Sequence, residues 1–172
     1  MNYEDYLSLV INNLKNNLIF NISQNIEFHG MKIDLFADCF FLSNDTVKNK
    51  AVPFNKYEIC EKYYLKSYNC VTRTDIMNFF SFLKCSSADY AGSQMHIQKS
   101  IIGIMVGNSS DENAKNLIEN LNYSKPYSLY FKGWSEIQLI FADLCTDKIY
   151  FNRAASKSSE LFKFDFLSHM KL

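Results

Sequence analysis

Apolar residues recur along the first third of the chain in a pattern that predicts one helix followed by three strands. Over residues 3–20 they are spaced three and four positions apart, which is typical of one face of an amphipathic helix. Residues 26–42 contain two extended apolar runs separated by a His-Gly pair, which predicts a β-hairpin. Aromatic and apolar side chains dominate residues 57–65, and they predict a third strand that ends near Lys66.

The rest of the chain alternates between predicted helices and strands. Thr72 and Asp75 have the spacing of a capping box, and the apolar residues after them predict a helix to about Lys84. The apolar run 101–106 predicts a buried strand, and a capped helix then extends to Leu121. Further predictions are a strand over 127–131, a helix over 134–144, an edge strand over 149–151 and an apolar cluster over 161–167. The order predicts an α/β class with a mixed sheet flanked by helices.

Composition supports one globular domain over residues 1–172 but nominates no partner. The chain is 48% hydrophobic and 21% charged, which argues against disorder. Its 18 basic and 18 acidic residues balance, so a nucleic-acid contact would need a local basic patch. The 5 cysteines form no C-x-x-C pair, which favours reduced thiols. With no secretory signal pattern and no membrane-length apolar run, we expect a cytoplasmic protein.

Common catalytic motifs are absent from the sequence, and two charged positions on predicted strands remain. No dinucleotide-binding loop, phosphate-binding loop, nucleophile elbow or zinc-protease motif occurs. Asp34 lies within the second strand of the predicted hairpin, and Lys66 ends the next strand. The placement of these two charged residues on neighbouring predicted strands is therefore what stands out in the sequence.

The order of helix, three strands, capped helix and buried strand, with Asp34 and Lys66 so placed, resembles the PD-(D/E)XK nuclease superfamily. It is most similar to Mrr-type restriction endonuclease-like domains, over residues 3–144. The resemblance implies a restriction-endonuclease-like fold and a Mg²⁺- or Mn²⁺-dependent DNA endonuclease, with a role in restriction or defence. It makes Asp34 the metal-binding aspartate, Lys66 the signature lysine and Glu4 a supporting metal ligand on the first helix. It also implies DNA as partner, with a homodimer or a separate recognition domain.

The signature departs from the family at Tyr64, two positions before Lys66, where the family has a carboxylate. A phenol is a poor Mg²⁺ ligand at neutral pH. Strand alternation places Lys62, Tyr64 and Lys66 on one face of the strand. Glu61 lies on the other face, so it cannot replace the missing carboxylate without a β-bulge.

Two alternatives to the nuclease follow from this departure. The first is a catalytically inactive nuclease-fold module that binds nucleic acid or protein, with Lys62, Tyr64 and Arg73 on a basic and aromatic surface. The second is an unrelated α/β domain whose strand order mimics the family, because short signatures recur by chance. A second acidic side chain in one cleft with Asp34 and Lys66 would favour the enzyme. An Asp34 without such a neighbour would favour the module.

Overall fold

The computed structural model describes residues 1–17, 21–43, 57–88, 96–108, 112–127 and 133–164. Its helices are α1 (Tyr3–Asn17), α2 (Arg73–Ala88) and α3 (Glu112–Asn120), with the short 3-10 helices η1 (Arg153–Ala155) and η2 (Ser158–Phe162). Its strands are β1 (Asn21–Phe28), β2 (Met31–Ser43), β3 (Tyr57–Cys70), β4 (His96–Asn108), β5 (Ser124–Pro126), β6 (Gly133–Asp143) and β7 (Lys148–Phe151). No helix in the described part is long and apolar enough to cross a membrane.

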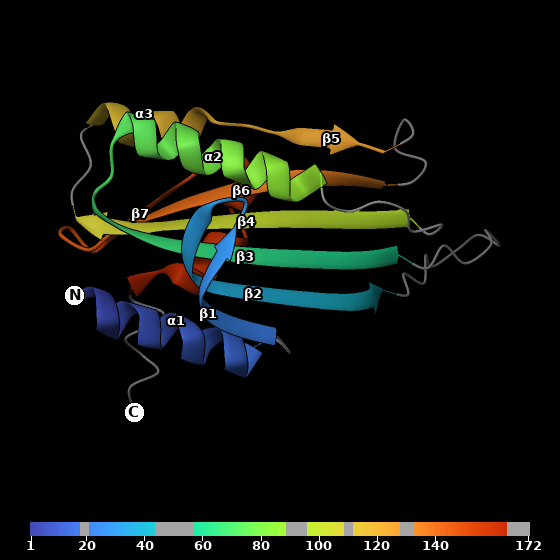
Figure 1. Ribbon diagram of the computed structural model, residues 1–172, viewed down its shortest axis with the longest axis horizontal. Helices are drawn as coiled ribbons and strands as arrows, with labels where there is room; N and C mark the ends of the chain where they lie inside the picture. The colour runs from blue at the N-terminus through green and yellow to red at the C-terminus, as the bar shows by residue number, and fades with distance from the viewer. Residues whose placement is uncertain (18–20, 44–56, 89–95, 109–111, 128–132, 165–172) are drawn as a thin grey trace.

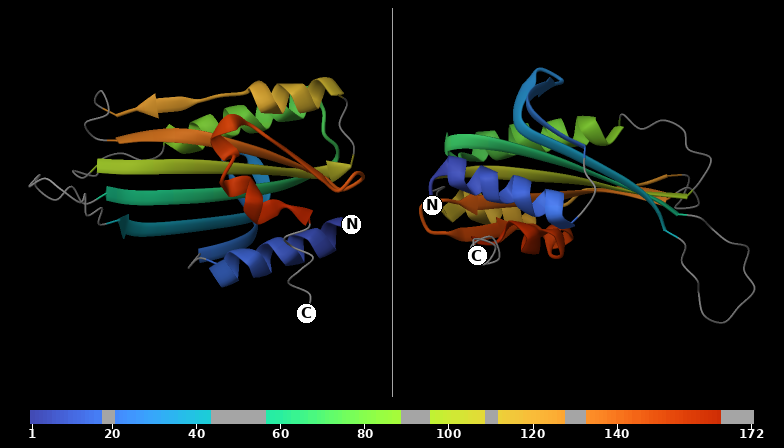
Figure 2. Two further views of the ribbon diagram at one scale, coloured as in Figure 1. Left: turned by 180° about the vertical axis from the view of Figure 1, so that it is seen from behind. Right: turned by 90° about the horizontal axis from the view of Figure 1, so that it is seen from below.

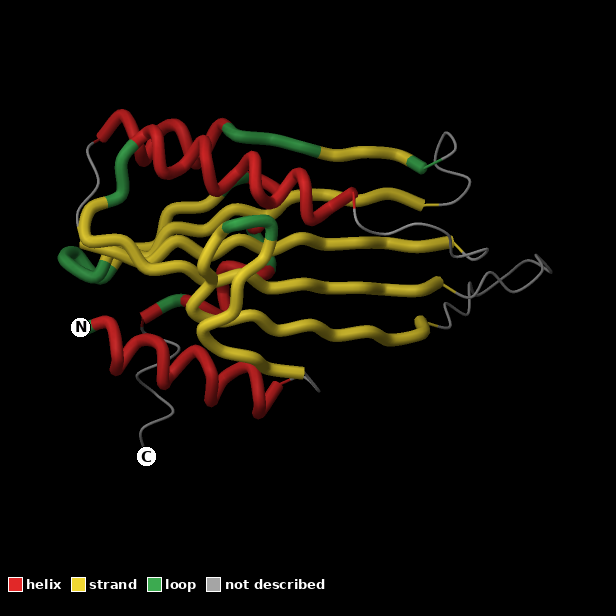
Figure 3. The backbone as a smooth tube through the Cα atoms, viewed as in Figure 1, coloured by secondary structure: helices red, strands yellow, loops and turns green. Residues whose placement is uncertain are grey.

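The strands form one mixed sheet of seven, which confirms the predicted α/β class (Figures 1 and 3). The order is β1-β2-β3-β4-β6-β5, and β7 also pairs with β6. Strands β1, β2 and β3 form an antiparallel meander, whereas β3, β4 and β6 run parallel to one another. Helix α2 connects the parallel strands β3 and β4, as a crossover of this kind requires.

Helical segments cover the two faces of the sheet as separate layers (Figures 1 and 2). Helix α1 and the η1–η2 segment pack on one face, over a core that includes Tyr6, Leu65 and Ile104. Helices α2 and α3 pack on the other face, over a second core that includes Phe79 and Phe141. Because both faces are covered, the central strands are apolar on both sides along part of their length.

Two local devices fix where α2 begins and ends. The predicted capping box is present: the Asp75 amide donates to Thr72 Oγ1 at 3.2 Å, and Asp75 Oδ2 accepts from the Thr72 amide at 3.0 Å. At the other end, the fully buried Lys99 of β4 donates through Nζ to the carbonyls of Ser86 and Ser87 at 3.3 and 3.1 Å. A cation at this end offsets the negative pole of the helix, so α2 extends beyond the predicted end at Lys84.

A glycine in β4 allows α2 to approach the sheet closely. A Cβ atom on Gly103 would meet the Phe79 ring at 2.9 Å and would overlap the Leu83 side chain. Both of those side chains are fully buried, so neither can move aside without disturbing the core.

The predicted helix over 134–144 is wrong, because this segment is strand β6. Its buried positions at Ile137, Leu139 and Phe141 pack toward α2 and α3, while Ile140 and Ala142 pack on the opposite face. A strand buried on both faces loses its apolar and polar alternation and can imitate the three-and-four spacing of a helix. The strand predicted over 127–131 falls mostly outside the described residues, and β5 ends before it at Pro126.

Candidate functional site

Strand β2 separates from β3 at Asp34, and this geometry decides what the aspartate can do. The last residue pair that joins the two strands is Leu35 with Leu65, yet β1 stays paired with β2 as far as Met31. The β1–β2 hairpin therefore bends away as a unit, toward the α2 side (Figure 2, right). Accordingly, Leu35 packs in the α1-side core, whereas Ile33 packs in the α2-side core.

Asp34 bridges the gap that this bend opens. Its Oδ2 atom accepts a hydrogen bond from the Ser67 amide at 2.7 Å and another from the Tyr3 hydroxyl at 2.9 Å. Burial raises the pKa of Tyr3, and the bond to Asp34 raises it further, so the phenol stays a donor. The carboxylate thus replaces a lost rung of the sheet and fastens α1 to β3.

Lys66 and Glu4 form no metal-binding cluster with Asp34 in the part of the chain that the structure describes. Lys66 donates through Nζ to the Lys32 carbonyl at 2.9 Å and lies 5.5 Å from the centre of the Tyr68 ring. Glu4 is exposed in the first turn of α1, where an acidic residue favours the helix dipole. Within the described residues, no ion pair joins Asp34 to Lys66.

Tyr64, at the position where the resemblance predicted a carboxylate, is 3% exposed. Its ring packs against Phe28, Phe36 and Phe82, with centroid distances of 5.6, 5.1 and 5.3 Å. The β1–β2 hairpin and α2 together supply these rings, so the bend in β2 closes over the tyrosine. No ring face is left for stacking on a base, and the role of Tyr64 in this structure is packing.

The donors at this site do not fit a Mg²⁺ or Mn²⁺ ion. Such ions need several oxygen ligands. The described residues contain no group of three or more Asp, Glu, His or Cys side chains that could hold a metal ion. A cavity of about 510 Å³ opens beside Tyr3 and Ser67, at the carboxyl ends of β3 and β4. Its lining contains no Asp, Glu, Lys or Arg side chain among the described residues. The residues around Asp34 and this cavity therefore do not supply the ligands that a catalytic Mg²⁺ or Mn²⁺ ion needs.

Lys62, Tyr64 and Arg73 do not form the single basic and aromatic surface that the sequence suggested. Lys62 is half-buried in the middle of β3, opposite Asp38 of β2. Arg73 is exposed at the start of α2, beyond the end of β3 at Cys70. That end is roughly 26 Å of extended strand away from Lys62. With Tyr64 buried between them, the three residues offer separate contacts and no continuous patch.

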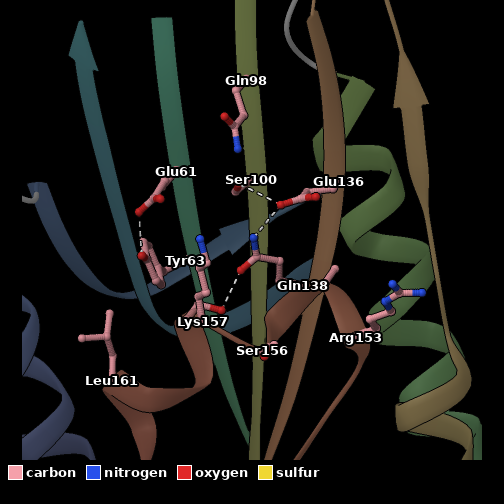
Figure 4. A pocket seen from close by; sticks show the side chains of 12 residues that line it. Glu61, Tyr63, Gln98, Ser100, Glu136, Gln138, Arg153, Ser156, Lys157 and Leu161 are labelled. Atoms are coloured by element: carbon pink, nitrogen blue, oxygen red, sulfur yellow. Dashed lines mark hydrogen bonds between the residues drawn. The ribbon is translucent and has the colours of Figure 1, made fainter. Parts of the chain in front are cut away.

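A polar cleft of about 670 Å³ lies on the α1-side face, over the amino-terminal halves of β3, β4 and β6 (Figure 4). On this face, α1 and the η1–η2 segment cover only the other halves of these strands (Figure 2, left). Glu61 of β3, Ser100 of β4 and Glu136 of β6 form one row across the floor, since their backbones pair in register. Arg153, Lys157 and Ser158 line the wall on the η1–η2 side.

Hydrogen bonds hold the floor of the cleft in a defined arrangement. Tyr63 donates to Glu61 Oε2 at 2.7 Å. Ser158 donates to Gln138 Oε1 at 2.6 Å, and Gln138 Nε2 in turn donates to Glu136 Oε1 at 2.8 Å. This chain of bonds links the η2 segment to β6 (Figure 4). The cleft therefore has a preorganised polar floor, which is a common property of small-molecule sites.

Sequence reasoning missed this cleft because it placed residues 134–144 in a helix. In a strand, the alternation of Glu136 and Gln138 with Ile137 and Leu139 puts the two polar side chains on one face. The same alternation at Gln98 and Ser100 precedes the apolar run of β4 and gives a matching signal. Two neighbouring strands that are polar on one face at the same level indicate a part of the sheet that no helix covers.

Buried tyrosines make the fold sensitive to alkaline pH. Burial raises the pKa of Tyr6 and Tyr63 above the ordinary value of 10.0, and the Glu61 charge adds to the effect at Tyr63. Above about pH 10 the unfolded chain loses these protons and the folded chain keeps them. Stability is thus complete below pH 10 and falls above it by about 1.4 kcal/mol per pH unit for each such tyrosine. Denaturant unfolding between pH 8.5 and 11.5 measures this slope.

The Tyr63→Phe variant is the control for this pH dependence. Its stability should be lower below about pH 10, because the bond to Glu61 is lost, and its slope above pH 10 should be shallower by one proton, so the difference from the parent should narrow as the pH rises. An unchanged slope in this variant would contradict the assignment to Tyr63.

Comparisons with known proteins place the chain in a family without assigning an activity. A family model described as "Domain of unknown function (DUF8052)" matches residues 2–164. Searches of curated proteins and of solved structures found no match to the chain.

Proposed function

We propose a function from the geometry of this chain, since the chain belongs to the DUF8052 family and the description of that family names no activity. The protein acts as a non-catalytic module on a nuclease-like scaffold, and it binds a ligand instead of cleaving phosphodiester bonds. The succession of α1, three antiparallel strands, α2 and a parallel β4, with α1 and α2 on opposite faces, supports the scaffold. The non-catalytic role is carried by one observation at Asp34.

That observation is the structural use of the Asp34 carboxylate. Both of its hydrogen bonds, from Tyr3 and from Ser67, go to Oδ2 and join α1 to the point where β2 and β3 separate. In the nuclease signature the partner carboxylate would stand at Tyr64, where this chain has a buried ring. Asp34 therefore serves as a structural bridge, and Tyr64 serves in packing where the signature has its second acid. Both roles hold the fold together and supply no catalytic group.

The nuclease stays a second candidate because Asp34 and Lys66 are neighbours on strands that separate at this point. That candidate would need Asp34 and Glu4 to hold Mg²⁺ or Mn²⁺, Lys66 to position the water and DNA as the substrate, and the described residues disfavour it because they form no metal-binding cluster. A homodimer or a separate recognition domain would then supply the second cut or the sequence specificity.

Cleavage assays distinguish the two candidates. We expect the purified chain to leave supercoiled plasmid and single-stranded DNA intact with either Mg²⁺ or Mn²⁺, and to behave like its Lys66→Ala variant. The Lys66→Ala substitution suits this test because it removes the signature lysine while the Asp34 bridge stays in place. Metal-dependent nicking that disappears in the folded Lys66→Ala variant would overturn the proposal and establish the nuclease.

A further inference from the structure

The polar cleft carries opposite charges that do not pair with each other. Glu61 and Glu136 stand on its floor, and Lys157 and Arg153 stand on its wall. In the part of the chain that the structure describes, no ion pair joins either carboxylate to either cation. Opposite charges that share a cleft without contact leave room for a third group that contacts both.

Each of the two floor carboxylates keeps one oxygen that can accept a hydrogen bond from a ligand. Glu61 and Glu136 lie on either side of Ser100 in one row, so their Cα atoms are roughly 10 Å apart, a distance of two strand spacings. Each has one oxygen that the floor already uses, Oε2 in Glu61 and Oε1 in Glu136. Among the described residues, the second oxygen of each carboxylate accepts no hydrogen bond, so both can receive a ligand's N–H groups.

Lys157 supplies the opposite charge at the mouth of the cleft. Its side chain is exposed and extends from the start of η2, between Tyr63 and Gln138, toward the row of the floor (Figure 4). Arg153 is also exposed and lies on the β6 side of the same wall. An anionic group that enters above the carboxylates would therefore meet an ammonium group at this wall.

From this arrangement we propose that the cleft binds a small zwitterion, of the class of free α-amino acids. The ligand's ammonium group donates to Glu136, and its carboxylate accepts from Lys157. Phosphate ligands, nucleic acid included, are disfavoured because the two floor carboxylates would repel them. A neutral polyol would leave the separated charges unpaired. This inference rests on the proposed binding role and names its site and its ligand class.

Binding of free amino acids to the full chain tests the proposal. Each of the twenty L-amino acids is titrated calorimetrically, without metal or DNA, and we expect saturable binding of at least one. Its N-acetyl derivative lacks the ammonium group and its amide lacks the carboxylate, so each should bind about 10-fold more weakly or not at all. A glycine-containing dipeptide series shows whether the ligand is a free amino acid or the end of a peptide.

Variants locate the site and separate it from the fold. Glu136→Gln and Lys157→Met should each weaken binding about 10-fold. Glu119→Gln on α3 and Lys125→Met on β5 make the same chemical changes at exposed positions outside the cleft and should leave binding unchanged. Thermal unfolding of all four variants is the check that they are folded.

Three results would overturn the inference. They are an absence of saturable binding by all twenty amino acids, equal binding of the N-acetyl or amide derivative, and binding that Glu136→Gln and Lys157→Met leave intact. None of these results bears on DNA cleavage, so the inference can fail while the non-catalytic role stands. Conversely, cleavage that depends on Lys66 would overturn the role and leave the binding data as they are.

Discussion

A Tyr64→Glu substitution, which would put a carboxylate where the nuclease resemblance expects one, should strongly destabilise the protein and should not create an active site. The glutamate would stand at a position that is 3% exposed, among the rings of Phe28, Phe36 and Phe82. A carboxylate buried without a partner either stays charged at high cost or takes up a proton. Together with the lost ring packing, we expect a loss of at least about 3 kcal/mol of stability. Denaturant unfolding at pH 7 measures it.

The Tyr64→Phe variant is the matched control, because it keeps the ring and removes only the hydroxyl. Its loss should be about 1 kcal/mol or less, because the ring packing against the three phenylalanines is kept. The acidic variant should also recover part of its stability as the pH falls toward 5, since protonation removes the buried charge. A folded Tyr64→Glu protein that cleaves DNA with Mg²⁺ would show instead that the signature position is open to the site.

The first two thirds of the fold could be predicted because local signals there agree with tertiary structure. Three local signals each favour a single structure: the Thr72–Asp75 capping box, the turn between β1 and β2, and the apolar run of β4. Strand β6 could not be predicted in the same way. Its second half is buried on both faces, so its sequence lacks the alternation that identifies a strand.

The site was harder to predict than the fold. The roles of Asp34 and Tyr64 depend on the bend of the β1–β2 hairpin away from β3, for which the sequence carries no local signal. Alternation correctly placed Tyr64 and Glu61 on opposite faces of β3. Alternation could not predict that the β1–β2 hairpin packs over Tyr64, or that Asp34 accepts a hydrogen bond from the Ser67 amide. Such features arise from contacts between distant segments, which no local pattern encodes.

The Asp34→Ala variant should lose about 2–4 kcal/mol of stability, and this distinguishes a structural aspartate from a catalytic one. The substitution leaves the Tyr3 hydroxyl and the Ser67 amide without their acceptor, and it releases α1 from β3. Asp34→Asn keeps one acceptor oxygen without the charge, so its loss should be about half as large. Asp38→Ala removes a half-buried carboxylate from the same strand, and we expect a loss below about 1 kcal/mol.

A metal-binding aspartate predicts the opposite result. Active-site carboxylates are held in arrangements that cost stability, so their removal commonly leaves stability unchanged or raises it. A double-mutant cycle of Tyr3→Phe with Asp34→Ala makes the comparison specific, because it isolates the bond between the two side chains. A coupling free energy of about 1 kcal/mol or more supports the structural bridge. A cycle without coupling, together with an Asp34→Ala protein as stable as the parent, would return Asp34 to the catalytic hypothesis.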